Sequence, residues 1–233
     1  ITYGNGFQNG YRGRDLSGTG WGLKFDFIII HESGHEWFAN SITNKDIADM
    51  WIHESFTNYS ESLFVEYYYG KEAGFEYVRG TRKGIDNDKP IIGHYDVNSE
   101  GSSDMYPKGG NMLHTLRQIV NNDEKWREIL RGLNSTFYHQ TVTTKQIEDY
   151  LSNATGVNLT AFFNQYLRDT RIPTLEYFFK KGFINFRWTN CVSGFDMPVK
   201  VTLNGAEQVL APKTEWKNIA TKTENQKLDV NRN

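Results

Sequence analysis

Two histidines and a glutamate stand at a spacing that suits metal chemistry. His31-Glu32-x-x-His35 lies in a stretch that we expect to be helical, entered through the apolar run 25–30. Residues four apart share one face of a helix, so the two imidazoles could hold one tetrahedral zinc ion. Glu32 would lie beside that ion, where a carboxylate can act as general base toward activated water. The motif predicts two metal ligands and a base.

A catalytic zinc site needs a third protein ligand. We expect a second helix over about 47–69, and Glu54 lies near its start, nineteen residues after His35. The short connection makes the two helices neighbours, so Glu54 is the candidate third ligand. Glu61 follows two helical turns later on the same face, where it could accept the second ring N–H of a ligand histidine. A merely solvated glutamate is the alternative for Glu61.

The other metal-binding residue types are poor candidates for this site. His53 adjoins Glu54 but points about 100° away around the helix. The single Cys191 excludes an intrachain disulfide and a cysteine-based zinc site. Three histidines have no ligand spacing, and we expect them to be structural or surface residues: His94, His114 and His139.

The composition is that of a globular protein. Of the 233 residues 38% are hydrophobic and 23% charged, and the formal charge is −2 with both signs interspersed. Nothing in this balance favours a nucleic-acid partner or an anionic membrane surface. The sequence has no apolar run near the ~20 residues that span a bilayer. We interpret the chain, which begins at Ile1, as an excised fragment, which leaves its compartment open between cytoplasm, periplasm and secretion.

Periodicity predicts helices followed by strands, an α+β fold. A helical domain over 1–170 is expected to precede a small β-sheet or sandwich module over 171–233. In the second part, Lys180-Lys181-Gly182 and Asn204-Gly205 are turn signals for two hairpins. The helices are expected at about 26–43, 47–69, 71–85, from 106 onward, and at 123–140, 145–154 and 159–169. Asp26 is a candidate cap for the first of them.

The metal motif and its surroundings resemble the gluzincin aminopeptidases, the aminopeptidase N family. The His-Glu-x-x-His motif, eighteen residues and Glu54 are similar to that family's zinc signature. Trp37-Phe38-Ala39-Asn40 resembles its Trp-Phe-Gly-Asn, and 51–56, Trp-Ile-His-Glu-Ser-Phe, resembles its Trp-Leu-Asn-Glu-Gly-Phe. Tyr106-Pro107-Lys108-Gly109-Gly110 is similar to its Tyr-x-Lys-Gly-Gly/Ala. Departures at 33–34, 36, 53 and 55 remove no donor atom.

The resemblance implies a zinc peptidase with a thermolysin-like catalytic domain and peptide substrates. One Zn²⁺ per chain would be held by His31, His35 and Glu54, with Glu32 as the base. The resemblance also implies that the hydroxyl of Tyr106 donates to the oxyanion formed when water attacks the scissile carbonyl. A phenol with a pKa near 10 can do so at neutral pH. From the residues alone, an aromatic cap on the helix start is the alternative for Tyr106.

Specificity for the substrate's amino terminus is a separate question. In the family, a Gly-x-Met-Glu-Asn stretch captures the free α-amine and precedes a short strand that Ile1-Thr2-Tyr3 resembles. We therefore expect that stretch to precede residue 1, and this chain alone to bind zinc yet show weak aminopeptidase activity. Two other interpretations stay open: a zinc endopeptidase or other zinc hydrolase with the same signature, and an inactive peptide-binding module.

Overall fold

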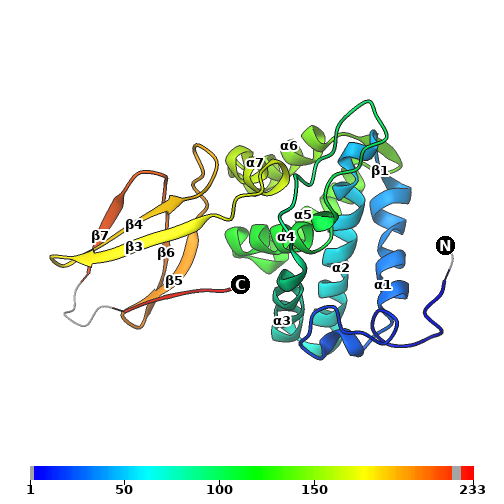
Figure 1. Cartoon of the computed structure of the whole chain (residues 1–233), viewed down its shortest axis with the longest axis horizontal. Helices are drawn as coiled ribbons and strands as arrows, with labels where there is room; N and C mark the ends of the chain where they lie inside the picture. The colour runs from blue at the N-terminus through cyan, green and yellow to red at the C-terminus, as the bar shows by residue number, and fades with distance from the viewer. Residues whose placement is uncertain (1–2, 222–226) are drawn as a thin grey trace. The chain divides into compact units, whose positions relative to one another are not determined.

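The computed structural model describes residues 3–221 and 227–233 and divides the chain into two compact units. The first comprises Ile1–Val157 with Asn233, and the second comprises Asn158–Arg232. Helices dominate the first unit and strands the second (Figure 1). The α+β fold class is confirmed. The division falls within the span 1–170 that the sequence suggests as one domain, because helix 160–168 packs with the strands through Tyr166.

The first unit is built around one long helix, α2, which contacts α1, α3 and α4 (Figure 1). Trp51, Ile52, Phe56 and Tyr59 of α2 are each at most 1% exposed. Burial of side chains of this size stabilises a fold by about 1.5–3 kcal/mol each. The helices are α1 (Phe27–Gly34), α2 (Trp51–Tyr69), α3 (Lys71–Thr81), α4 (Pro107–Val120), α5 (Asp123–Thr136) and α6 (Thr144–Thr155).

Short 3-10 turns and a two-stranded sheet connect these helices. The turns span Trp21–Leu23, Ile47–Asp49, Arg82–Gly84 and Ser103–Met105. Strands β1 (Ile42–Asn44) and β2 (Gln140–Val142) pair in parallel. The expected helix 123–140 is therefore too long, because residues 140–142 pair with β1 as a strand.

The expected continuous helix over 26–43 is wrong. Asp26 does cap the helix, accepting from the amides of Ile28 and Ile29 at 3.1 and 3.3 Å. Helix α1 nevertheless ends at Gly34, and a kinked segment, Glu36–Ser41, follows with non-helical dihedrals at Phe38. The carbonyl of Phe38 accepts a hydrogen bond from a side chain, as described below, and hydrophobic periodicity carries no signal of such a bond. Of the expected strand 1–3, Ile1 and Thr2 lie outside the described residues and Tyr3 is not in a strand.

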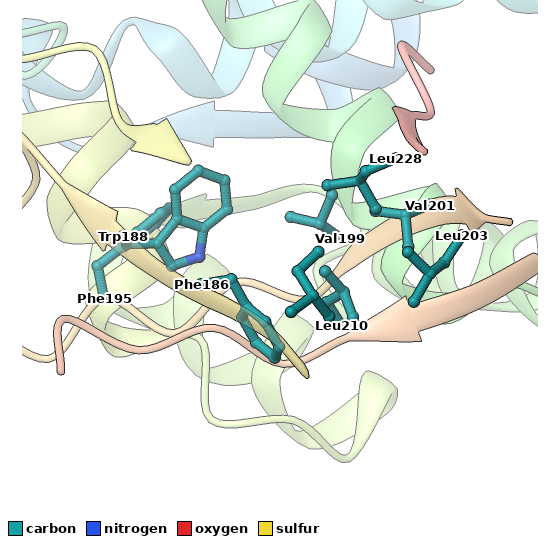
Figure 2. Packing of buried hydrophobic residues seen from close by; sticks show 9 residues of the cluster. Phe186, Trp188, Phe195, Val199, Val201, Leu203, Leu210 and Leu228 are labelled. Atoms are coloured by element: carbon teal, nitrogen blue, oxygen red, sulfur yellow. The ribbon is translucent and has the colours of Figure 1, made fainter. Parts of the chain in front are cut away.

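The second unit contains α7 (Thr160–Arg168) and two three-stranded antiparallel sheets, ordered β3-β4-β7 and β6-β5-β8. Both expected hairpins are present, with positive φ at Lys181-Gly182 and at Asn204-Gly205. Side chains from both sheets form one buried cluster, seen in Figure 2 around Phe186, Val201 and Leu210. The strands are β3 (Thr174–Lys180), β4 (Phe183–Thr189), β5 (Val199–Leu203), β6 (Ala206–Leu210), β7 (Lys217–Ala220) and β8 (Leu228–Val230).

Within the described part of the chain, no helix has both the length and the apolar character needed to cross a membrane.

Candidate metal centre

The structure brings the three predicted ligands together at the contact between α1 and α2. Nε2 of His31 lies 3.2 Å from Oε2 of Glu54, and Nε2 of His35 lies 3.6 Å from the same oxygen. Ligand atoms about 2.0–2.1 Å from a tetrahedral zinc lie about 3.3 Å from one another. The observed separations therefore suit a single zinc ion. Over residues 3–221 and 227–233, this is the one group of three or more His, Cys, Asp or Glu side chains close enough to hold a metal.

The outer ring nitrogens of both histidines already have partners. Nδ1 of His31 lies 2.8 Å from Oε1 of Glu61. Nδ1 of His35 lies 3.0 Å from the carbonyl of Phe38 and 3.2 Å from the hydroxyl of Thr57. Because a carbonyl and a carboxylate can only accept, both rings donate from Nδ1, which leaves Nε2 as the ring nitrogen that could bind a metal ion in place of a proton. Ligand histidines are commonly oriented in this way.

The kink after His35 explains one of these partners. A continuous helix would direct the carbonyl of Phe38 along the helix axis toward the amide four residues on. The non-helical dihedrals at Phe38 turn this carbonyl to the imidazole instead. The segment that periodicity could not describe therefore orients the second candidate ligand.

Glu61 is fully buried and accepts three hydrogen bonds. Besides His31, the amide of Asn58 donates to Oε1 at 3.1 Å and the hydroxyl of Tyr77 donates to Oε2 at 2.6 Å. Burial raises the pKa of Glu61, while the bonds from these partners act to lower it. The sequence analysis missed Tyr77, which lies sixteen residues away on α3. The helical periodicity of α3 could have placed Tyr77 on its buried face, but it carries no signal of the partner.

Negative charge surrounds the His31 ring. Burial acts to lower the pKa of His31, but hydrogen bonds and charge from Glu54 and Glu61 outweigh it and raise the pKa to about 9. The surroundings thus favour positive charge at this ring. A divalent cation beside Nε2 would satisfy the same two carboxylates in place of the proton. The donor set and its charge therefore both fit zinc.

Glu32 and Tyr106 lie near the same centre. Glu32 is half-buried on α1, and the Tyr106 ring, 37% exposed, lies 5.8 Å from the His31 ring between centroids. Burial, together with the charges of Glu54, Glu100 and Glu32, raises the pKa of Tyr106. Its phenol consequently keeps its proton throughout the neutral range. Tyr106 also occupies the N-cap position of α4, so the geometry leaves room for both interpretations of this residue.

Two glycines bring the start of α4 close to α2. A Cβ atom at Gly109 would lie 1.9 Å from Oγ of Ser55, and one at Gly110 would lie 2.3 Å from Oδ1 of Asn58. No side chain fits at either contact. The glycines that follow Tyr106 therefore set how near this residue comes to the helix that carries Glu54.

The remaining histidines are not part of the group that could hold a metal. Nε2 of His53 accepts the amide N–H of Asn44 at 2.9 Å, and burial lowers the pKa of His53 to about 4. This ring is neutral and engaged elsewhere, as its position around the helix suggested. His114 is buried with its ring edge-on to Phe75, while two others are exposed: His94 and His139.

The chain belongs to peptidase family M1, because the sequence profile of the "Peptidase family M1 domain" matches residues 23–166. The family-level resemblance seen in the motifs is thus confirmed. In fold, the chain is similar to Legionella pneumophila aminopeptidase A, with a TM-score of 0.66 and 15% identity, covering 88% of this chain and 25% of that one. It is also similar to an M1 zinc metallopeptidase from Deinococcus radiodurans, with a TM-score of 0.54 and 21% identity, covering 65% and 35%.

Curated relatives extend well beyond the matched region. Aminopeptidase N of Lactococcus lactis subsp. lactis is 26% identical over 162 residues, which is 64% of this chain and 19% of the relative. Leukotriene A-4 hydrolase of Xenopus laevis is 27% identical over 137 residues, which is 53% of this chain and 22% of the relative. The chain therefore spans about a fifth of the length of these relatives.

Proposed function

We propose that this chain carries the zinc centre of a peptidase that removes amino acids from the N-termini of peptides, with one Zn²⁺ per chain. The observation that carries the proposal is the convergence of Nε2 of His31, Nε2 of His35 and Oε2 of Glu54 at separations that suit one zinc ion. Membership of peptidase family M1 supports it.

The chain's own residues divide the remaining work. Zinc, when bound, lowers the pKa of a water ligand from 15.7 to about 7 and polarises the scissile carbonyl. Glu32 accepts the proton of the attacking water and passes it to the leaving amine. The hydroxyl of Tyr106 donates a hydrogen bond to the developing oxyanion, and its raised pKa keeps the proton in place. Glu61 holds the His31 ring in its orientation.

The choice of an aminopeptidase over an endopeptidase is supported by the names of the relatives, which include aminopeptidase N from several bacteria. An aminopeptidase needs the free α-amine, whereas an endopeptidase does not. In protein extended upstream of residue 1 to include the expected amine-capturing stretch, aminoacyl chromogenic substrates and their N-acetylated counterparts therefore separate the two. Faster cleavage of the acetylated series would show that the centre serves an endopeptidase.

Replacing Glu32 by Gln tests the mechanism. Loss of a general base lowers turnover by about 10²- to 10⁴-fold. Zinc content, measured by elemental analysis, should stay at one per chain because Glu32 is not among the converging ligand atoms. The matched variant His35→Ala should lose zinc as well as activity. Substantial hydrolysis by zinc-loaded E32Q protein would refute the assignment of Glu32.

A further inference from the structure

A buried serine links the helix of the third candidate ligand to the turn that carries Tyr106. Ser55 follows Glu54 on α2 and has no exposed surface. Its hydroxyl donates to the carbonyl of Met105 at 2.7 Å. Met105 is the last residue of the 3-10 turn Ser103–Met105, and Tyr106 follows it directly. The acceptor of this hydrogen bond is therefore the residue directly before Tyr106.

The contact leaves the turn little freedom. Met105 is 3% exposed, so water cannot readily replace Ser55 as the partner of its carbonyl. On the other side of Tyr106, the Gly110 amide donates to the Tyr106 carbonyl at 2.9 Å. Gly109 also packs closely against the Ser55 hydroxyl, since a Cβ at this glycine would lie 1.9 Å away, and this contact restricts the start of α4. The backbone of Tyr106 is thus held through the carbonyl of the preceding residue, Met105, and through its own carbonyl.

We propose that Ser55 is a positioning residue for Tyr106. Its bond to Met105 fixes the position of the Tyr106 phenol relative to the candidate ligand Glu54. A role for Ser55 in catalysis rests on the proposed function. The hydrogen bond from Ser55 to Met105 does not depend on bound zinc. Ser55 is not among the converging ligands, and its hydroxyl is engaged with the Met105 carbonyl.

Helix α2 offers a matched control. Ser62 is also buried, at 3% exposure, and its hydroxyl donates to a backbone carbonyl, that of Gly74, at 3.0 Å. This bond joins α2 to α3 and not to the Tyr106 turn. Ser55→Ala and Ser62→Ala therefore each remove one buried hydroxyl from the same helix, and only the first should disturb Tyr106.

The first experiment is independent of metal. In protein with ¹³C-labelled tyrosine rings, the Tyr106 signal is assigned by its absence in Tyr106→Phe. We expect S55A to shift or broaden that signal and S62A to leave it unchanged. Ser55→Cys keeps a small side chain with only a weak donor and serves if S55A does not fold. An unchanged Tyr106 signal in the folded Ser55 variant would overturn the proposal, whether or not the protein binds zinc.

The second experiment tests the consequence for the site. A phosphinic dipeptide analogue mimics the tetrahedral oxyanion, and its affinity for the zinc-loaded protein is measured by calorimetry. One oxyanion donor is worth about 10²–10³-fold, so a displaced Tyr106 should cost about tenfold. S55A in the Y106F background should cost nothing further, and zinc affinity should change less than about threefold. If S55A lowers the affinity for the analogue equally with and without Tyr106, the positioning role is refuted. If the parent protein does not bind zinc, only the proposed function is refuted.

Discussion

Replacing Glu61 by Gln isolates the charge that the fold places behind the first candidate ligand. The amide oxygen of glutamine can accept from His31 and Asn58 as Oε1 does. Its NH₂ group can donate to the hydroxyl of Tyr77, which then turns to act as acceptor. The shape and the hydrogen bonds of the site are thus retained. The negative charge that raises the basicity of His31 is lost.

The expected effect is a weaker zinc site in an intact fold. Loss of a carboxylate behind a ligand histidine lowers metal affinity by about 10- to 100-fold. At 1.36 kcal/mol per tenfold, this amounts to about 1.4–2.7 kcal/mol. Metal-free stability should not fall in parallel, because burial disfavours the charged form of Glu61 and glutamine removes that cost.

The assay is competition for zinc with a chromogenic chelator at pH 7. Glu66→Gln is the matched control: Glu66 lies on the same helix but pairs with Arg117, its two oxygens lying 2.5 and 2.8 Å from the guanidinium nitrogens. That variant should lose stability and keep its zinc affinity. Tyr77→Phe, which removes one bond to Glu61, should show a smaller loss of affinity than E61Q. A zinc Kd for E61Q within threefold of the parent protein would refute the reasoning.

Two further predictions concern the fold around the centre. Gly109→Ala should destabilise by about 1–3 kcal/mol in urea denaturation, because its Cβ would meet Ser55, whereas Gly84→Ala, with nothing within 4 Å, should be neutral; equal effects would contradict the close-packing argument. Hydrogen bonds from Arg117 and Lys71 lower the pKa of Asp123 to about 2. Its stabilisation is complete above the unfolded pKa of about 3.9 and is lost as pH falls toward 2. Because the Asp123 side chain is 40% exposed, Asp123→Asn should lower the free energy of unfolding by only about 1 kcal/mol at pH 7. The variant should also lose less stability than the parent protein between about pH 4 and pH 2; an equal loss in both proteins would exclude the ion pairs of Asp123 as its cause.

The sequence predicted the parts of the centre that depend on spacing along the chain. His31 and His35 share a helix face, and a short connection leads to Glu54, so their proximity follows from helix geometry. The partners of the outer nitrogens could be predicted only in part. Glu61 shares a helix face with Glu54, whereas Phe38 offers a backbone carbonyl and Tyr77 approaches from another helix. Neither of the last two contacts leaves a periodic signal in the sequence.

The limits of the elements show the same distinction. Asp26 was recognisable as a cap because capping depends only on neighbouring residues. The turn at Asn204-Gly205 was recognisable because few other residues adopt its backbone angles. After α1 ends at Gly34, the backbone kinks at Phe38 and its carbonyl bonds to the His35 ring, and no local pattern in the sequence indicates either feature. The assignment of α7 to the second unit depends on Tyr166 packing against the sheets, a contact between segments distant in sequence.

The close approach of Ser55 and Gly109 also constrains how this sequence can drift. The two positions share room for one small side chain, since a Cβ at 109 would lie 1.9 Å from the serine hydroxyl. The Cβ of Ser55 would itself lie 2.6 Å from a Cβ at 109, so a larger residue becomes tolerable at 109 only once residue 55 is glycine. A substitution at 109 that comes first gives a destabilised protein. In descendants of this gene, a substitution at 109 is therefore expected to follow one at 55, although 53 residues lie between the two positions.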